Sequence, residues 1–269
     1  PAARHERERG RHPVYDAFQH MQIGETFSRD ETRETVIPTY MGLVKQIDDH
    51  LGRLFAYLET SGRMRDTAII FTSDHGDYLG DHWLGEKELF HEPSSRVPLI
   101  VYDPDARADA TRGTTDPRFV EGIDILPTIL EAMDVPIPTH RVEGRSLLPS
   151  VRGASDSTTL PWREAAFSEI DYALYKARLT LGIQNDKARA YMIRTDRWKF
   201  IYYHGIWDRH GLYDLETDPR EIHNLIEVPA FRERAQAMRK QLFDELDPYH
   251  SNAGQVELHR RRCGPDCLG

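Results

Sequence analysis

The feature that constrains the fold most is a long amphipathic helix pattern that leads directly into a short strand pattern. Over residues 40–58, apolar side chains recur at three- and four-residue steps, as on one helix face, and Ser61-Gly62 ends the pattern. Residues 67–72 then form a largely apolar run typical of a buried parallel strand, and residues 97–102 form a second. A short helix is expected over residues 125–133. This order of helix, strand, loop, strand and helix predicts an α/β fold.

The sequence changes character after Gly153. Four short stretches separated by turn residues predict an antiparallel sheet, with a hairpin at Arg194-Thr195-Asp196-Arg197. These stretches are residues 165–170, 190–194, 198–203 and 211–215. Tyr202 and Tyr203 should point to opposite faces of the sheet, and a last helix is expected after Pro229. The expected domains are a partial α/β core over residues 1–152, a sheet-and-helix subdomain over residues 153–249 and a polar tail over residues 250–269.

Charge and apolar content limit the partners of the chain. Its formal charge is −9, from 35 basic and 44 acidic side chains, which argues against nucleic acid and against an anionic membrane as the main partner. A small anionic substrate needs only a local cluster of cations. No stretch approaches the ~20 consecutive apolar residues of a membrane span, and the charged start lacks a signal peptide's apolar segment. The only cysteines are Cys263 and Cys267, so a cytoplasmic location is expected.

The first 37 residues are polar and are expected to be irregular, except that Ser28-Arg29-Asp30-Glu31 resembles a capping box that opens a short helix. The chemistry is expected directly after the first predicted strand, because ligands of open α/β sheets bind beyond the carboxyl ends of strands. Asp74 and His75 occupy that position, where a carboxylate and an imidazole make a partial shell for a divalent cation. Two ligands are too few to hold an ion. The alternative is that both are turn residues that end the strand.

A longer series of motifs surrounds this pair. In order they are Phe71-Thr72-Ser73-Asp74-His75-Gly76, Leu79-Gly80-Asp81-His82, Lys87, Arg96-Val97-Pro98-Leu99-Ile100, Gly122-Ile123-Asp124-Ile125-Leu126-Pro127-Thr128-Ile129-Leu130, Gly144-Arg145-Ser146-Leu147-Leu148, and Leu212-Tyr213-Asp214-Leu215-Glu216-Thr217-Asp218-Pro219 with Glu221 and Asn224-Leu225. The motifs from Phe71 to Ile100 resemble the second signature region of sulfatases and phosphonate monoester hydrolases, in the alkaline phosphatase superfamily. The later motifs are further matches to the same family, in the expected order. The resemblance implies the C-terminal part of an alkaline-phosphatase-like α/β sandwich with an appended small antiparallel sheet plus helix.

The same resemblance implies roles for individual residues. Asp74 and His75 would complete the site of one divalent metal ion, which would be Mn²⁺, Ca²⁺ or Mg²⁺. Lys87 stands thirteen residues beyond Asp74. It would be both the catalytic and the substrate-binding candidate, because its ammonium would offset charge on the sulfuryl or phosphoryl oxygens. His82 is a second substrate-binding candidate, although a structural, hydrogen-bonded role suits both His82 and His91 better.

The nucleophile of this family is a formylglycine made from Cys or Ser in a Cys-x-Pro-x-Arg motif, and no such motif precedes Tyr40. Cys263-Gly264-Pro265-Asp266-Cys267 ends in Cys where the motif needs Arg. The expectation is therefore an incomplete metal-dependent hydrolase of phosphonate or phosphate monoesters or diesters, or of sulfate esters, whose nucleophile lies outside this chain. The alternatives are an arylsulfatase-type sulfuric ester hydrolase and, from another class, a noncatalytic binding or assembly module. A homo-oligomer is compatible with each of them.

Overall fold

A computed structural model of the chain describes residue 8 and residues 10–154, 162–206 and 209–246. Two units of internal packing alternate along the sequence: unit 1 comprises residues 1–33, 77–95 and 165–269, and unit 2 comprises residues 34–76 and 96–164. The domain division expected near residue 152 stays a prediction. The expected tail, with Cys263 and Cys267, lies outside the described residues.

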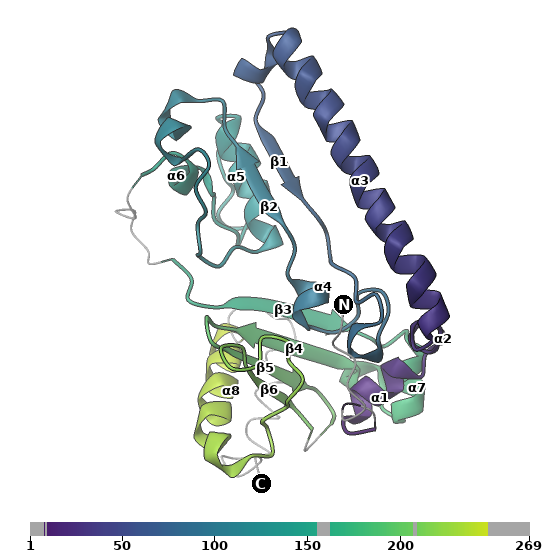
Figure 1. Ribbon diagram of the computed structural model, residues 1–269. Helices are drawn as coiled ribbons and strands as arrows, with labels where there is room; N and C mark the ends of the chain where they lie inside the picture. The colour runs from purple at the N-terminus through teal and green to yellow at the C-terminus, as the bar shows by residue number, and fades with distance from the viewer. Residues whose placement is uncertain (1–7, 9, 155–161, 207–208, 247–269) are drawn as a thin grey trace. The chain divides into compact units, whose positions relative to one another are not determined.

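Unit 1 is built on a four-stranded antiparallel sheet in which strands consecutive in sequence are neighbours (Figure 1). Its strands are β3 (Ala166–Asp171), β4 (Arg189–Arg194), β5 (Trp198–Tyr203) and β6 (Gly211–Asp214). The predicted hairpin joins β4 to β5, where the Thr195 amide donates to the Trp198 carbonyl oxygen at 2.8 Å. The antiparallel sheet expected from the sequence is confirmed.

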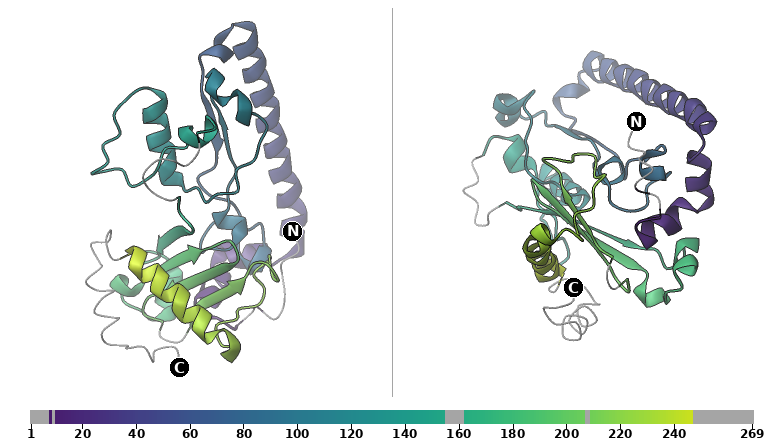
Figure 2. Two further views of the ribbon diagram at one scale, coloured as in Figure 1. Left: turned by 90° about the vertical axis from the view of Figure 1, so that its left-hand side faces the viewer. Right: turned by 60° about the horizontal axis from the view of Figure 1, so that its bottom comes forward.

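Helix α8 (Arg232–Leu246) covers one face of this sheet (Figures 1 and 2). Its Met238 and Leu242 share a buried apolar cluster with Phe200 and Tyr202 of β5. Tyr203, the next residue along β5, belongs to the cluster on the opposite face. The expected alternation of the two tyrosines is therefore confirmed, because successive side chains of a strand point to opposite faces.

The opposite face of the sheet packs against the N-terminal segment and against residues 77–95. Val14 and Phe18 from the first of these, and Tyr78 and Phe90 from the second, are at most 3% exposed and belong to one cluster. The helices of this part of unit 1 are α1 (Pro13–Gln19), α2 (Gln22–Phe27), α4 (Glu92–Ser95) and α7 (Lys176–Leu181). The expectation of an irregular N-terminal segment is wrong over α1 and α2, since helices of six or seven residues are too short to show a period.

Acid is expected to destabilise unit 1 through His12, the residue that precedes α1. Burial lowers the pKa of His12 from 6.5 to about 4, although its ring also donates to the Arg209 carbonyl oxygen at 3.1 Å. Because the folded pKa lies below the unfolded one, the unfolded chain binds more protons as pH falls from 6.5 toward 4. Stability that is present above pH 6.5 is thus lost in that window, by about 2 kcal/mol at pH 5.

The measurement is the free energy of unfolding in urea at pH 7 and pH 5. The difference between the two pH values should shrink in His12→Gln and persist in the control His20→Gln, whose side chain is 64% exposed. An equal pH dependence in the wild type and His12→Gln would contradict the assignment.

Unit 2 contains most of α3 (Asp30–Thr60), with β1 (Ile69–Thr72), β2 (Leu99–Tyr102), α5 (Ile125–Ala132) and α6 (Leu148–Val151). The two strands pair antiparallel, with Ile69 opposite Tyr102. The expectation of parallel strands is therefore wrong for this pair.

Short 3₁₀ turns occur in both units, at Arg63–Arg65, Asp81–Trp83, Ala106–Thr111, Gly122–Asp124, Asn185–Lys187 and Pro229–Phe231.

Helix α3 confirms the predicted helix and extends it by ten residues toward the N-terminus. Pro38 lies inside it. A proline is ordinarily found in the first turn of a helix or where a helix breaks, so the sequence predicted a helix start after Pro38, at Tyr40. Ser28, expected in a capping box, is the C-cap of α2 and donates to the Glu25 carbonyl oxygen at 2.7 Å. Gly62 follows α3 with φ 74°, as expected for a left-handed helix end.

Large apolar side chains on α3 are exposed, and we refer to them as the α3 apolar stripe. They are Tyr40, Met41, Leu43, Val44, Ile47, Leu54 and Tyr57. Ile100 on β2 is 62% exposed, and Leu126 on α5 is 52% exposed. An amphipathic helix normally buries its apolar face against other elements, and a contiguous exposed apolar patch marks an interaction surface. Unit 2 thus has apolar faces left uncovered by the described residues.

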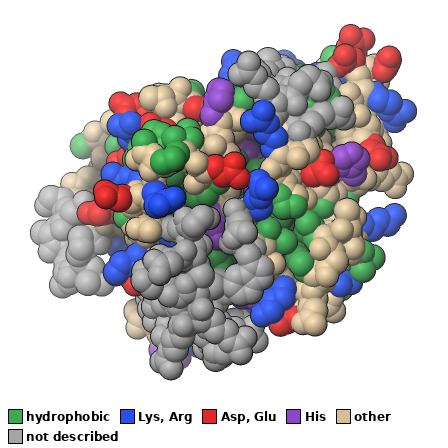
Figure 3. All heavy atoms as spheres, turned by 90° about the horizontal axis from the view of Figure 1, so that it is seen from below, with side chains coloured by type: hydrophobic (Ala, Val, Ile, Leu, Met, Phe, Trp, Pro, Cys, Tyr) green, Lys and Arg blue, Asp and Glu red, His purple; other side chains and the backbone are tan. Residues whose placement is uncertain are grey.

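No described helix combines the length and apolarity needed to cross a bilayer. On the face seen in Figure 3, acidic and basic side chains of the described residues are intermixed. The charge on this face is therefore local rather than spread over a broad surface of one sign.

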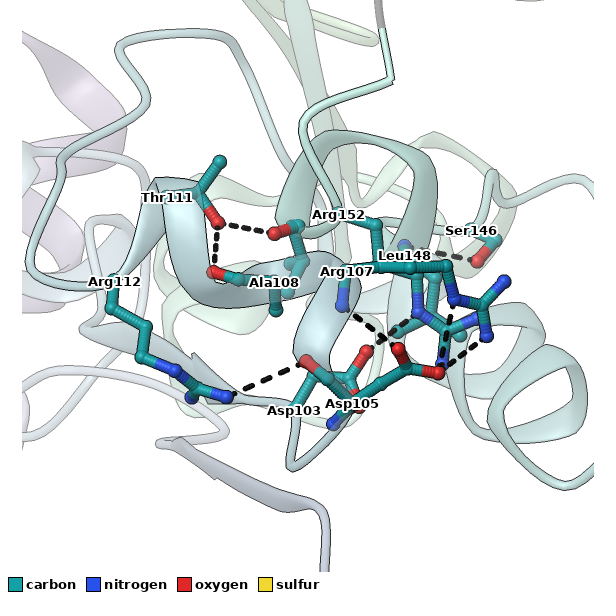
Figure 4. Close-up of polar contacts among 10 residues, drawn as sticks. Asp103, Asp105, Arg107, Ala108, Thr111, Arg112, Ser146, Leu148 and Arg152 are labelled. Carbon is teal, nitrogen blue, oxygen red and sulfur yellow. Dashed lines mark hydrogen bonds and ion pairs between the residues drawn. The ribbon is translucent and has the colours of Figure 1, made fainter.

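An ionic cluster closes the turn that follows β2 (Figure 4). Arg152, next to α6, donates from Nε to Asp103 Oδ2 at 2.6 Å, and Asp103 is buried. Asp105 accepts from the Arg107 amide at 2.9 Å and from its Nε at 3.0 Å. These hydrogen bonds hold the pKa of Asp105 well below its usual range. Both carboxylates are engaged by arginines, so the cluster ties β2 to α6.

Two of the sequence motifs meet at Asp124, which is fully buried. Asp124 accepts from the Arg145 amide at 2.8 Å and from Arg163 Nη2 at 2.8 Å. Thr128 Oγ1 donates to the Asp124 carbonyl oxygen at 2.6 Å and accepts from the Leu147 amide at 2.9 Å. The motifs at residues 122–130 and 144–148 therefore contact each other at Asp124 and Thr128, and we call this contact the joint of unit 2.

Gly144→Ala is expected to destabilise unit 2. A Cβ atom at Gly144 would lie 2.0 Å from the Ile123 carbonyl oxygen, so the backbone of the joint would have to shift. Overpacking of this kind costs about 1–3 kcal/mol. The urea unfolding free energy measures the loss, with Gly52→Ala as the control because no atom lies within 4 Å of a Cβ there. Equal stability of Gly144→Ala and Gly52→Ala would refute the steric argument.

Candidate active site

The two candidate metal ligands lie in the turn that directly follows β1. His75 Nε2 is 3.3 Å from Asp74 Oδ2, so the two side chains point toward one another. The Asp74 carboxylate also accepts from the His75 amide at 3.0 Å, and Ser73 Oγ donates to the His75 carbonyl oxygen at 2.7 Å. The side chains of Asp74 and His75 are 84% and 38% exposed. The turn therefore presents a carboxylate and an imidazole together to solvent.

The orientation of the His75 ring fits a metal ligand. Its Nδ1 is 2.7 Å from the Gly76 carbonyl oxygen, and a carbonyl only accepts, so Nδ1 carries a proton. In the neutral ring Nε2 then has the lone pair, and this atom is 3.3 Å from Asp74 Oδ2. Two electron-rich atoms this close repel one another unless a proton or a cation lies beside them. A histidine that donates one ring N–H to a backbone carbonyl while its other nitrogen binds metal is the usual arrangement in metal sites.

The pair remains a partial shell. Among the described residues, no three or more His, Cys, Asp or Glu side chains converge in a way that could hold an ion. A divalent cation takes more ligands than one carboxylate and one imidazole supply. The residues therefore fit part of a metal site, and the remaining ligands have to come from elsewhere.

Residues 77–95, which we call the Lys87 loop, have an unusual backbone. Five residues other than glycine adopt positive φ: Leu79, His82, Trp83, Glu86 and Leu89, with values from 48° to 75°. Each such residue costs about 1–2 kcal/mol relative to right-handed conformations. Gly80 has φ 93°, a left-handed value that glycine adopts readily. The conformation persists only if contacts outside the loop support it, and strain of this kind clusters at functional sites.

Lys87 lies at the exposed part of this loop. Its backbone is fixed, because the Lys87 amide donates to Glu88 Oε2 at 3.3 Å and its carbonyl oxygen accepts from Ser94 Oγ. No described carboxylate lies within ion-pair distance of its ammonium group. Lys87 thus combines a held backbone with an accessible cation, which is what binding an anion requires.

His82 lies in the interior of unit 1. Its ring stacks on His91 with centroids 3.8 Å apart, and its Nδ1 is 2.7 Å from Glu8 Oε1. Gln19 donates to the His82 carbonyl oxygen at 2.9 Å. Burial lowers the pKa of His91 well below its usual value, and His91 Nδ1 lies 3.0 Å from the Tyr78 hydroxyl. These contacts favour the structural role for both histidines, while substrate binding by His82 stays a prediction.

Sequence reasoning missed a buried ionic group beneath the Lys87 loop. Lys199 on β5 is completely buried, with Nζ 2.6 Å from Glu221 Oε1 and 2.9 Å from Glu92 Oε1. Burial raises the pKa of Glu221, whereas Lys199 and Arg194 outweigh burial at Glu92 and lower its pKa. The available signal was a lysine within the apolar run of residues 198–203, because a lysine is almost never fully buried unless it is paired.

The structure therefore brings together Asp74 with His75, and His82 with His91. Asp74 and His75 belong to unit 2, whereas Lys87 and His82 belong to unit 1. The distance between the metal pair and Lys87 stays a prediction.

Comparison with known proteins identifies the family. The family model "N-sulphoglucosamine sulphohydrolase, C-terminal" matches residues 80–247, and the model "Sulfatase" matches residues 9–135. The multifunctional alkaline phosphatase superfamily protein PehA of Trinickia caryophylli is 36% identical over 77% of this chain and 39% of its own. An N-acetylglucosamine-6-O-sulfatase of Bacteroides thetaiotaomicron is 30% identical over 79% of this chain and 36% of its own. The crystal structure of the phosphonate monoester hydrolase of Agrobacterium radiobacter matches with a TM-score of 0.72 and 30% identity, over 80% of this chain and 42% of that one.

The fold and these matches define an alkaline-phosphatase-like α/β protein. Within that superfamily, the chain belongs to the sulfatase and phosphonate monoester hydrolase family. It spans less than half the length of each of these three relatives.

Proposed function

We propose that the chain supplies two metal ligands and a substrate-binding ammonium group to a metal-dependent ester hydrolase. The observation that carries the proposal is the pairing of His75 Nε2 with Asp74 Oδ2 at 3.3 Å. Because Nδ1 donates to the Gly76 carbonyl oxygen, Nε2 is the nitrogen of the neutral ring whose lone pair can bind a metal ion. A bound divalent cation would act as a Lewis acid on an ester oxygen. Mn²⁺, Ca²⁺ and Mg²⁺ all suit a site with carboxylate ligands.

In this proposal, Lys87 binds the anionic group of the substrate. Charge grows on the sulfuryl or phosphoryl oxygens as the ester bond breaks, and a fixed ammonium stabilises that charge more than the ground state. The attacking group, a formylglycine in this family, lies outside this chain. In this proposal the residues of the chain therefore act by coordinating the metal ion and by stabilising the negative charge on the substrate oxygens.

The proposed substrates are phosphonate or phosphate monoesters and diesters, with sulfate esters as the alternative. PehA and the phosphonate monoester hydrolase support the first class, and the N-acetylglucosamine-6-O-sulfatase supports the second. Both classes present tetrahedral anionic oxygens that a lysine can bind. A cytoplasmic location remains part of the proposal, based on the scarcity of cysteine.

A second candidate, an assembly module without catalysis of its own, is favoured by the α3 apolar stripe. Exposed apolar surface of this extent marks a site where further polypeptide packs, whether an additional segment or a second copy. Both candidates require an additional polypeptide to complete the α/β layer. We use the term assembled enzyme for this chain joined to the sulfatase-family segment that carries the nucleophile.

The purified 269-residue chain is expected to hydrolyse aryl phosphonates and aryl sulfates no faster than its own Lys87→Ala variant. The reason is that neither the nucleophile nor a complete metal shell is present among the identified residues. The measurement is release of the aryl alcohol with Mn²⁺, Ca²⁺ or Mg²⁺ added. Turnover that depends on Lys87 in the purified chain would overturn the incomplete-enzyme proposal.

A further inference from the structure

We propose that Lys199 and Glu221 are positioning residues that hold the Lys87 loop in its strained conformation. For its functional meaning the inference rests on the proposed role of Lys87. The loop contains Lys87, and it carries positive φ at five residues other than glycine. Contacts from outside the loop have to keep that backbone in place.

Lys199 contacts the loop through its buried ammonium group. Its Nζ donates to the Phe90 carbonyl oxygen at 2.8 Å and lies 2.9 Å from Glu92 Oε1 and 2.6 Å from Glu221 Oε1. Phe90 and Glu92 belong to the loop, three and five positions after Lys87. The buried ammonium group therefore makes one hydrogen bond and two ion pairs. Two of these three contacts are with the loop.

Glu221 holds the same stretch of loop from the other side. Its Oε2 accepts from the Glu92 backbone amide at 2.7 Å. The Glu221 side chain is completely buried and lies in the segment after β6, within the motif Asp218-Pro219 to Leu225. That segment is fixed to the sheet, since the Leu225 amide donates to the Leu212 carbonyl oxygen at 2.8 Å. The motif thus connects the sheet to the loop.

The charges of the group balance. Arg194 Nε lies 3.3 Å from Glu92 Oε1, so two cations, Lys199 and Arg194, face two carboxylates. A buried ion pair is weak evidence for stability, because replacing the whole pair by apolar residues is often neutral, while removing one partner is strongly destabilising. Lys199 and Glu221 are therefore better explained by the loop atoms that they bind than by stability alone.

This distinction gives the test. The double variant Lys199→Met/Glu221→Met removes both buried charges together and leaves Glu92 paired with Arg194. Its thermal midpoint should lie near that of the wild type, whereas Lys199→Met alone should lower it. In the double variant the Phe90 carbonyl and the Glu92 amide lose their partners. Hydrogen exchange of amides in residues 77–95 should then be at least about tenfold faster, with α8 amides unchanged.

Lys240→Met serves as the matched control, because Lys240 is exposed on α8 and pairs only with Asp244 in the described structure. Glu92→Gln is the second variant if the double variant does not fold. It weakens the link between the loop and Lys199 without leaving Glu221 unpaired, and it should also speed exchange in the loop. Unchanged exchange in the loop would overturn the inference. Faster exchange of equal size throughout β4 and β5 would also overturn it, because that result indicates a purely structural role.

A separate arm tests Lys87 itself. The rate at which an amine-reactive acylating reagent modifies Lys87 is measured by peptide mass spectrometry, with and without inorganic phosphate or sulfate. In the wild type the anions should slow acylation of Lys87 and leave Lys240 unaffected, and in the double variant this protection should be lost. No protection in the wild type would refute the proposed role of Lys87, while loop exchange would still decide the positioning role. Protection retained in full by the double variant would overturn the positioning role.

Discussion

In the assembled enzyme, Asp74→Ala is expected to lower bound divalent metal and turnover together. The carboxylate of Asp74 is one of the two proposed metal ligands, which lie 3.3 Å apart, and we expect that His75 alone cannot replace it. Loss of Lewis-acid stabilisation is worth several kcal/mol in the transition state, which corresponds to a fall in turnover of about 10³-fold or more. Metal per protein is measured by elemental analysis after dialysis, and turnover is measured on an aryl phosphonate.

Asp48→Ala is the matched control for this change. Asp48 is an exposed carboxylate on α3 whose nearest described cation, Lys45, is 3.8 Å away. Metal content and turnover should both stay at wild-type values in this variant. If Asp74→Ala retained both its metal and its turnover, the ligand assignment would be wrong.

Lys87→Ala in the assembled enzyme is expected to lower kcat by about 10²–10³-fold, the usual cost of removing one donor to a developing oxyanion. The metal content should not change, because Lys87 is not a ligand. This separates the variant from Asp74→Ala, in which the metal is lost as well. The measurement is steady-state kinetics on aryl phosphonate and aryl sulfate substrates.

Lys240→Ala on α8 provides the control for loss of a surface ammonium, and its kcat should match the wild type. An unchanged kcat with a raised KM in Lys87→Ala would mean that Lys87 binds substrate and transition state equally. Such a result would remove Lys87 from the catalytic role and leave it only a binding role.

The sheet of unit 1 was predictable because its turns are local in sequence. Thr195 and Asp196 separate two apolar runs, and strand alternation then assigns Tyr202 and Tyr203 to opposite faces. The pairing of β1 with β2 was not predictable in direction. A short apolar run predicts a strand, and it contains no information on the direction of the neighbouring strand.

The helical N-terminal segment was missed for a related reason. Helices α1 and α2 are short, and Val14 and Phe18 become buried only by packing on the sheet of unit 1. Their stability comes from tertiary contacts rather than from propensity, which a single sequence does not reveal. The first part of α3 was missed because Pro38 lies inside the helix, where a proline is ordinarily unfavourable. The rest of the helix outweighs the cost of this one proline.

The proximity of Asp74 and His75 was predictable because the two residues are neighbours in sequence. The support of the Lys87 loop was not, because it depends on contacts far apart in the chain. Lys199 binds the carbonyl oxygen of Phe90, 109 residues earlier. Glu221 appeared only as part of a motif, and its partner at Glu92 is 129 residues away. Side chains that position a site from such distances leave no local pattern.

The central claim is that the turn after β1 binds a divalent cation. The most direct test is anomalous diffraction from crystals of the assembled enzyme grown with Mn²⁺. We expect a manganese peak within about 2.0–2.6 Å of both a carboxylate oxygen of Asp74 and Nε2 of His75, distances usual for metal–oxygen and metal–nitrogen bonds. A bound manganese ion at another place, with Asp74 and His75 still paired and without metal, would contradict the claim.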